Sequence, residues 1–225
     1  MSYSVVGNIL LVASILVTIG AQILIKHRYK KYSEVANSKG LSGVEVAQEI
    51  LRKNNIDDVY VVETRGYLSD HYDPGQKVVR LSSEVFHGKS ISAASIAAHE
   101  VGHAIQHKEG NVFINIRKFI FPLVSISSKL GYVIILIGLF AGMLKLFYIG
   151  ILMLFVILFF QLVTLPVEFD ASRRALVNLE KYNLLSKDEK SGAFKVLGAA
   201  ALTYVAGLAT SLMEIVRLLL IVRND

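Results

Sequence analysis

The chain has 225 residues, of which 53% are hydrophobic and 19% are charged, and its mean hydropathy is +0.51. Such a mean hydropathy is high for a soluble protein and typical of one that lies partly in lipid. The formal net charge of +6 is explained by membrane topology, and nucleic-acid binding is not indicated because no basic stretch is interleaved with exposed aromatic residues. The sequence contains no cysteine, which fits a reducing compartment.

Long apolar stretches without Asp, Glu, Lys or Arg predict about four transmembrane helices. These stretches are residues 5–25, 130–144, 146–167 and 196–213. A helix needs about 20 apolar residues to cross a bilayer, and the first and third stretches meet that length alone. The second does so if its helix begins near Phe121. The fourth is slightly short unless its helix continues past Glu214 and Arg217 to Val222.

The positions of the positive charges predict the orientation of these helices. Four basic residues directly follow the first apolar stretch, whereas the short loop between the second and third stretches carries only Lys145. Six further lysines and arginines lie between Arg173 and Lys195. By the positive-inside rule, the chain starts outside, and residues 26–120 and 168–195 are cytoplasmic.

The predicted fold is a mainly α integral membrane protein with a small cytoplasmic α+β unit. We expect the following five parts: a transmembrane helix in residues 1–25, a cytoplasmic unit in 26–120, a transmembrane hairpin of two helices in 121–167, a cytoplasmic segment in 168–195, and a fourth transmembrane helix with the C-terminus in 196–225.

The cytoplasmic unit shows both helical and strand patterns. Residues 59–63 (VYVVE) and 77–82 (KVVRLS) are rich in β-branched residues and predict strands. Ser90 or Ser92 is placed to cap the helix that contains the sequence HEVGH. Residues 43–53 (GVEVAQEILRK) predict an earlier helix, whose apolar face consists of Val44, Ala47, Ile50 and Leu51.

A small polar cluster lies between the two predicted strands. It consists of Asp70, His71 and Asp73, and an Asp-Pro-Gly turn begins at Asp73. Such a cluster is able to bind a metal or a substrate. More often the Asp side chains bond nearby backbone groups, so we favour turn chemistry here.

The sequence HEVGH predicts a zinc site on a helix. His99 and His103 are four residues apart and therefore lie on one helix face, where both imidazoles reach one ion. Glu100 is rotated by about 100° from His99, near the ion but not bound to it, where it takes a proton from water that the ion activates. We predict His99 and His103 as zinc ligands and Glu100 as the general base.

A catalytic zinc usually has three protein ligands, so a third residue is needed. His107 lies one more turn along the same helix, and a straight helix can hardly offer three successive turns to one ion. The metzincin pattern fails because Gln106 and Glu109 stand where Gly and His are required. Glu168 is the preferred ligand, because the membrane hairpin leaves and returns to the same membrane face. The alternative for Glu168 is an interfacial acid beside two arginines.

HEVGH, the membrane hairpin and the sequence EFDASRRAL (residues 168–176) together resemble the YugP-like neutral zinc metallopeptidases of bacteria. The HtpX-type and CAAX-prenyl-type membrane proteases are similar in plan, and residues 66–82 look like the YugP-like family specifically. The resemblance covers nearly the whole chain. It implies a zincin-like catalytic unit in a bacterial cell membrane and a zinc-dependent endopeptidase of the gluzincin type. It assigns His99, His103 and Glu168 to the metal and Glu100 to the base.

The resemblance also raises three finer expectations. HtpX-type proteins carry an Asp where this chain has Ser172, so either Ser172 or another acid such as Asp170 supports a ligand histidine. The strand at 77–82 is expected to be the edge strand that pairs with an extended substrate, so that Val79→Pro impairs cleavage without zinc loss. Tyr204 is a candidate oxyanion donor by residue type only, and a tyrosine in a membrane helix is more often an interface anchor.

The predicted function is that of a membrane-embedded endopeptidase that cuts membrane-proximal or unfolded protein segments, with quality control as one role. The alternative is a zinc-binding membrane sensor or scaffold without hydrolysis. A transporter is disfavoured because charges within the apolar stretches are sparse. The implied partners are a peptide or protein substrate and the lipid bilayer, without nucleic acid. The sequence does not determine the oligomeric state.

Overall fold

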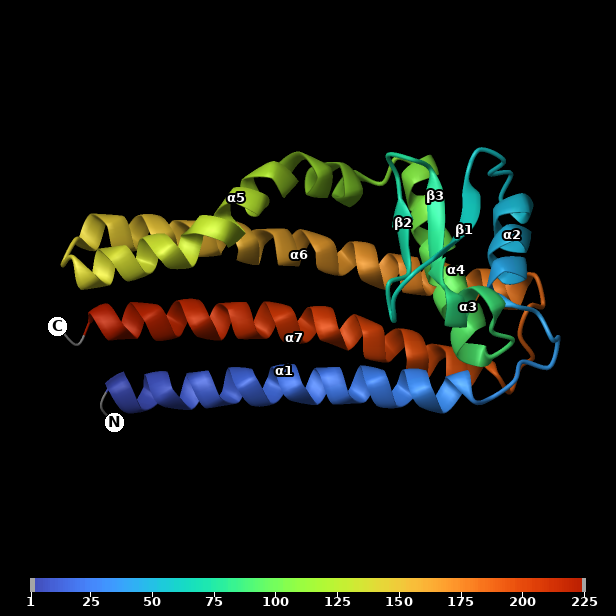
Figure 1. Cartoon of the computed structure of the whole chain (residues 1–225), viewed down its shortest axis with the longest axis horizontal. Coiled ribbons are helices and arrows are strands. Elements are labelled where there is room, and N and C mark those ends of the chain that lie inside the picture. Colours follow the sequence, from blue (N-terminus) through green and yellow to red (C-terminus); the bar gives the residue numbers. More distant parts are fainter. Residues whose placement is uncertain (1–2, 224–225) are drawn as a thin grey trace. The chain divides into compact units, whose positions relative to one another are not determined.

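A computed structural model describes residues 3–223 of the chain, and most of them are helical (Figure 1). The elements are α1 (Tyr3–Ser33), α2 (Gly43–Lys53), β1 (Tyr60–Thr64), β2 (His71–Asp73), β3 (Val78–Ser82), α3 (Ser83–His87), α4 (Ile91–Lys108), α5 (Val112–Phe140), α6 (Leu144–Lys181) and α7 (Lys190–Val222). They divide into two compact units. The first comprises the residues up to Gln22, Asn115–Pro166 and the residues from Leu202 onward, and the second comprises Ile23–Ile114 and Val167–Ala201.

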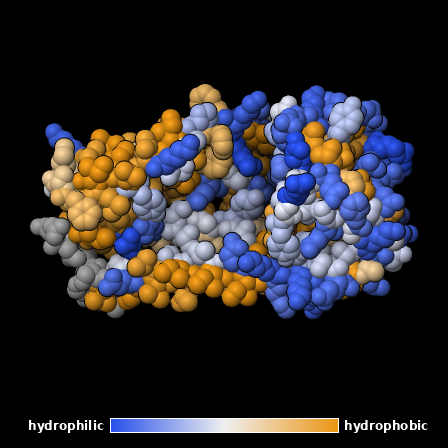
Figure 2. Space-filling model, in the orientation of Figure 1, coloured by the Kyte–Doolittle hydropathy of each residue, from blue (hydrophilic) through white to orange (hydrophobic). Residues whose placement is uncertain are grey.

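Four of the described helices, α1, α5, α6 and α7, are long and apolar enough to cross a membrane. Their side chains leave many large apolar groups on the surface, and Figure 2 shows this hydrophobic surface along the long helices. A surface of this kind is stable in lipid rather than in water. The prediction of a mainly α integral membrane protein with four apolar helices and a small α+β unit is therefore confirmed.

Helix α7 continues past the two charges that made the fourth apolar stretch doubtful. Glu214 and Arg217 lie one turn apart on this helix and form an ion pair at 2.6 Å, so the two charges compensate each other. Elsewhere in the first unit, α5 and α6 approach closely through glycines. A Cβ at Gly138 would lie 2.5 Å from the backbone nitrogen of Phe147, so only glycine permits this approach.

The second unit contains a three-stranded sheet with the order β1-β3-β2. Strand β3 pairs parallel with β1 and antiparallel with β2, so both of its edges are occupied. The expectation that residues 77–82 form an edge strand for substrate is therefore wrong. Val79 lies at the centre of the sheet with no exposed surface, and a proline there would test the stability of the sheet rather than substrate pairing.

Local sequence signals account for the ends of the elements. Helix α2 begins with a capping box, in which Ser42 and Glu45 satisfy each other's backbone N–H groups. Its bounds agree with the predicted helix, but Val46 is buried where Val44 was expected, and Val44 is only half-buried. Strand β2 was not predicted, because three residues are too few for a visible alternation of polar and apolar side chains.

Helix α4, which carries HEVGH, is the central helix of the second unit. Ser90 is its N-cap, and the side chain of Ser90 accepts a hydrogen bond from the backbone N–H of Ala93. The alternative cap, Ser92, is buried inside the helix. The helix is lined with alanines that have almost no exposed surface, so neighbouring backbones pack close to it.

Helix α6 continues through Glu168 to Lys181, so Glu168, expected just past the third membrane span, lies within a continuous helix. Gly102 of α4 lies directly against this part of α6. A Cβ at Gly102 would lie 2.7 Å from the carbonyl oxygen of Ala171, a distance that real Cβ atoms do not show. The glycine of HEVGH is therefore required for the close approach of α4 and α6.

We expect Gly102→Ala to lower the free energy of unfolding by about 1–3 kcal/mol, because the added methyl group pushes α4 away from α6. Thermal unfolding in detergent measures this change. Gly198→Ala in α7 is the matched control, since no heavy atom lies within 4 Å of its Cβ position. Replacing that helical glycine is expected to stabilise the protein by up to about 1 kcal/mol. Equal effects of the two substitutions would contradict the close packing of α4 on α6.

Candidate metal centre

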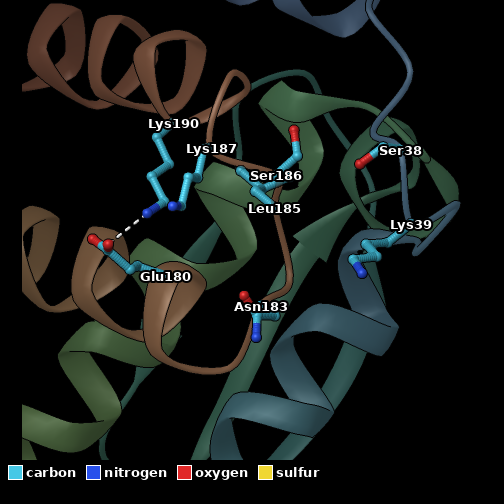
Figure 3. A pocket seen from close by; sticks show the side chains of 8 residues that line it. All are labelled: Ser38, Lys39, Glu180, Asn183, Leu185, Ser186, Lys187 and Lys190. Carbon is cyan, nitrogen blue, oxygen red and sulfur yellow. Dashed lines mark ion pairs between the residues drawn. The ribbon is translucent and has the colours of Figure 1, made fainter.

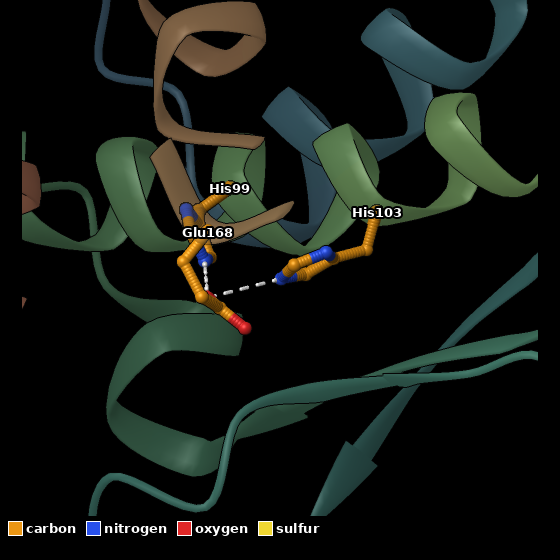
Figure 4. Close-up of side chains that lie close together, drawn as sticks. All are labelled: His99, His103 and Glu168. Atoms are coloured by element: carbon orange, nitrogen blue, oxygen red, sulfur yellow. Dashed lines mark ion pairs between the residues drawn. The ribbon is translucent and has the colours of Figure 1, made fainter. Parts of the chain in front are cut away.

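Three side chains predicted as metal ligands converge within the second unit (Figure 4). His99 and His103 come from successive turns of α4, and Glu168 comes from α6. The Oε2 atom of Glu168 lies 3.3 Å from Nε2 of His99 and 3.5 Å from Nε2 of His103. One ligand atom from each residue falls within 4.8 Å of the other two.

This donor set fits a zinc ion. Two ligand atoms that each lie about 2.05 Å from a tetrahedral zinc are roughly 3.3 Å apart, close to the separations between Glu168 and the two imidazoles. Glu168 is only 2% exposed, and a carboxylate buried in this way requires positive charge beside it. Two imidazoles and one carboxylate are also the ligand types that zinc accepts.

The second ring nitrogen of His99 has a partner of its own. Its Nδ1 atom lies 3.2 Å from the hydroxyl oxygen of Ser172, one turn beyond Glu168 on α6. Of the two supporting residues that the sequence left open, Ser172 is therefore the one that contacts His99. Asp170 instead contacts Gln106 at 2.8 Å. In the sequence, Gln106 is notable only as a departure from the metzincin pattern. Its position three residues after His103 was nevertheless a signal that the two side chains contact each other.

Glu100 lies beside the cluster without joining it. The residue is 8% exposed, and among residues 3–223 no hydrogen bond or ion pair engages its carboxylate. Burial lowers the pKa of His103, but the negative charges of Glu100 and Glu168 beside it outweigh burial, so that this pKa is raised. Glu100 is thus close enough to act electrostatically on a predicted ligand, as a general base near the ion must be.

Two other candidates lie outside the cluster. The Nδ1 atom of His107 lies 3.0 Å from the hydroxyl of Tyr72 on β2, and His107 is not part of the three-residue group. Tyr204 is 40% exposed on α7 and belongs to the first unit, whereas the cluster belongs to the second. Its role as an oxyanion donor remains a prediction.

In the polar cluster before β3, the two Asp side chains bond nearby backbone groups, as predicted from the sequence. Asp73 accepts hydrogen bonds from the backbone N–H groups of Gly75 and Gln76, which forms the turn after β2. Asp70 accepts from the backbone and the hydroxyl of Ser82 at the end of β3. Burial raises the pKa of Asp70, against the effect of these hydrogen bonds.

A cavity of about 380 Å³ in the second unit contains none of the three converging residues (Figure 3). Three lysines line it, Lys39, Lys187 and Lys190. Glu180 pairs with Lys190 at 2.5 Å, and the carboxylate of Glu189 accepts hydrogen bonds from the backbone N–H groups of Ser38 and Ser186. With Glu180 as the one acidic residue and no histidine among its described lining residues, this cavity offers no metal-ligating cluster.

Comparison with known proteins agrees with the chemistry of the cluster. Residues 8–223 match the model of a protein family described as "Putative neutral zinc metallopeptidase". The chain is also 45% identical over 215 residues to "Putative membrane protease YugP" of Bacillus subtilis (strain 168), and the match covers 96% of each chain. No solved structure matches the chain. The family match includes both units and all three converging side chains.

Proposed function

We propose that this chain, which belongs to the family of neutral zinc metallopeptidases, is an endopeptidase of the HExxH type. It is an integral membrane protein, and its cofactor is zinc. In this proposal His99, His103 and Glu168 bind the zinc, and Glu100 is the general base. The observation that carries the proposal is the approach of the buried Glu168 carboxylate to both imidazoles, with Glu100 beside them.

The proposed reaction assigns each proton to a residue of the chain. A bound zinc supplies a Lewis acid that polarises the scissile carbonyl and lowers the pKa of water. Glu100 accepts a proton from the attacking water as its oxygen bonds to the carbonyl carbon. Glu100 then donates this proton to the amide nitrogen while the C–N bond breaks, which leaves a carboxylic acid and an amine. The low exposure of Glu100 keeps bulk water from competing for the proton.

We expect Glu100→Gln to retain about one zinc per chain and to lose peptide cleavage by roughly 10²–10⁴-fold, because the amide cannot accept the proton. Glu168→Ala is expected to lose the zinc itself. Metal content and cleavage of a labelled unfolded protein are measured on the same samples. Full activity of Glu100→Gln would contradict its role as base. Zinc without cleavage in every variant, wild type included, would favour the sensor or scaffold.

Substrate pairing is assigned to strand β2 rather than to β3. Strand β2 is an edge of the sheet, and β3 occupies only its other side. The hydrogen bond between the Tyr72 hydroxyl and His107 connects β2 to a residue that lies one helical turn, about 6 Å, beyond His103 on α4. We therefore propose that an extended peptide, from a membrane-proximal or unfolded segment, pairs with the free edge of β2 beside the metal centre.

A series of peptide substrates, each N-methylated at one successive position, tests this pairing. Since alternate N–H groups of an extended peptide face the strand beside it, KM is expected to rise at every second position. The unmethylated peptide is the reference, and zinc content is the control for enzyme integrity. A rise at successive positions, or at none, would exclude pairing with a strand edge.

We further propose that the metal centre faces the cytoplasm. The support is the distribution of positive charge. Basic residues follow the first apolar stretch and lie between the third and fourth stretches, whereas Lys145 is the single basic residue between the second and third. Removal of damaged membrane proteins, a quality-control role, fits an active unit on that side.

Because the chain has no cysteine, single-cysteine labelling measures this orientation directly. Lys145→Cys and Lys187→Cys place a thiol at exposed positions, at the start of α6 and in the second unit, respectively. A membrane-impermeant maleimide applied to intact cells is expected to label the first variant, and the second only after lysis. The reverse pattern would place the metal centre outside.

A further inference from the structure

Gln106 is a fully buried side chain that links α4 to α6 beside the metal centre. Its side-chain nitrogen donates hydrogen bonds to the backbone carbonyl of Val167 and to Oδ2 of Asp170, both at 2.8 Å. Its side-chain oxygen lies 3.0 Å from Nδ1 of His103. The residue has no exposed surface, so water does not replace any of these contacts.

The orientation of the Gln106 amide follows from its partners. A backbone carbonyl and a carboxylate accept hydrogen bonds but cannot donate them, so the NH₂ group must face Val167 and Asp170. The amide oxygen is then left to face His103. Because this oxygen is only an acceptor, the Nδ1 atom of His103 must carry the hydrogen of that contact.

Asp170 is held as a hydrogen-bond acceptor by two arginines. Arg174 donates to its Oδ2 atom at 2.6 Å, and Arg173 donates to its Oδ1 atom at 2.7 Å. Arg174 also pairs with Glu109 at the end of α4 at 2.8 Å. These contacts keep the Asp170 carboxylate charged and in place. If the Gln106 amide rotated by 180°, its oxygen would face this carboxylate, and two acceptors cannot form a hydrogen bond.

We propose that Gln106 is a positioning residue that keeps His103 in the tautomer with hydrogen on Nδ1, so that the lone pair of Nε2 points toward Glu168 and the metal. This inference rests on the proposed zinc site. It distinguishes the two histidines, because the Ser172 hydroxyl near His99 both donates and accepts and so does not select a tautomer. His103 therefore already has the tautomer that a metal ligand needs in the metal-free protein.

The first test is the tautomer itself, measured in metal-free protein with ¹⁵N-labelled histidine. The ¹⁵N chemical shifts of the two ring nitrogens identify which one carries hydrogen, and comparison with His103→Gln assigns the signals. In the wild type at a pH where His103 is neutral, we expect hydrogen on Nδ1. Hydrogen on Nε2 would overturn the inference, and this result needs no variant of Gln106.

The second test is zinc affinity, measured by competition with a chelator of known affinity. Gln106→Met keeps the volume of the side chain but removes all three polar contacts, and it is expected to weaken zinc binding about 10–100-fold. Gln161→Met is the matched control, since Gln161 lies in the first unit on α6 and its substitution is expected to leave zinc affinity unchanged.

The outcomes separate the inference from the proposed function. If the wild type binds zinc and Gln106→Met binds it equally well, the positioning role is wrong while the zinc site stands. If the wild type binds no zinc, the proposed function fails, and the tautomer measured in the metal-free sample still decides the inference.

Discussion

The approach of one buried carboxylate to two imidazoles is the interaction on which the rest of the site depends. Glu168 is 2% exposed, and burying a carboxylate costs free energy that neighbouring groups must offset. The two histidines reduce this cost only if α4 and α6 lie in direct contact. Gly102 permits that contact, because it leaves room for the backbone of Ala171. The glycine of HEVGH is therefore as necessary for the geometry as the ligands themselves.

The two histidines receive different support from their surroundings. Ser172 gives His99 a neutral partner that adapts to either tautomer, whereas His103 contacts an amide whose orientation is determined by Val167 and Asp170. In the proposed zinc site, His103 would be fixed in one tautomer before metal binding, whereas His99 could take either. A fixed tautomer would lower the free-energy cost of binding a metal there.

Much of this site was predictable from the sequence, and the failures have identifiable physical causes. Helical spacing in HEVGH brought His99 and His103 together as candidate ligands with Glu100 beside them, and the hairpin topology pointed to Glu168. The apolar stretch indicates the membrane span but not how far its helix continues, so the extension of α6 to Lys181 was not predicted. Gln106 was overlooked because its role depends on α6, which is distant in sequence.

The sheet shows a similar division between local and long-range information. β1 and β3 are visible as β-branched runs, but strand order depends on β2, whose three residues carry no periodic pattern. The central position of β3 and the free edge of β2 could therefore not be predicted from the sequence. Polar contacts between distant elements and the order of strands are the features that required the structure.

The most direct test of the central claim is anomalous scattering at the zinc edge from crystals of the purified protein. One zinc is expected, with Nε2 of His99, Nε2 of His103 and the Glu168 carboxylate each within about 2.0–2.2 Å of the ion. A zinc ion held by other residues, or a zinc-containing crystal with no anomalous peak between these three side chains, would contradict the account.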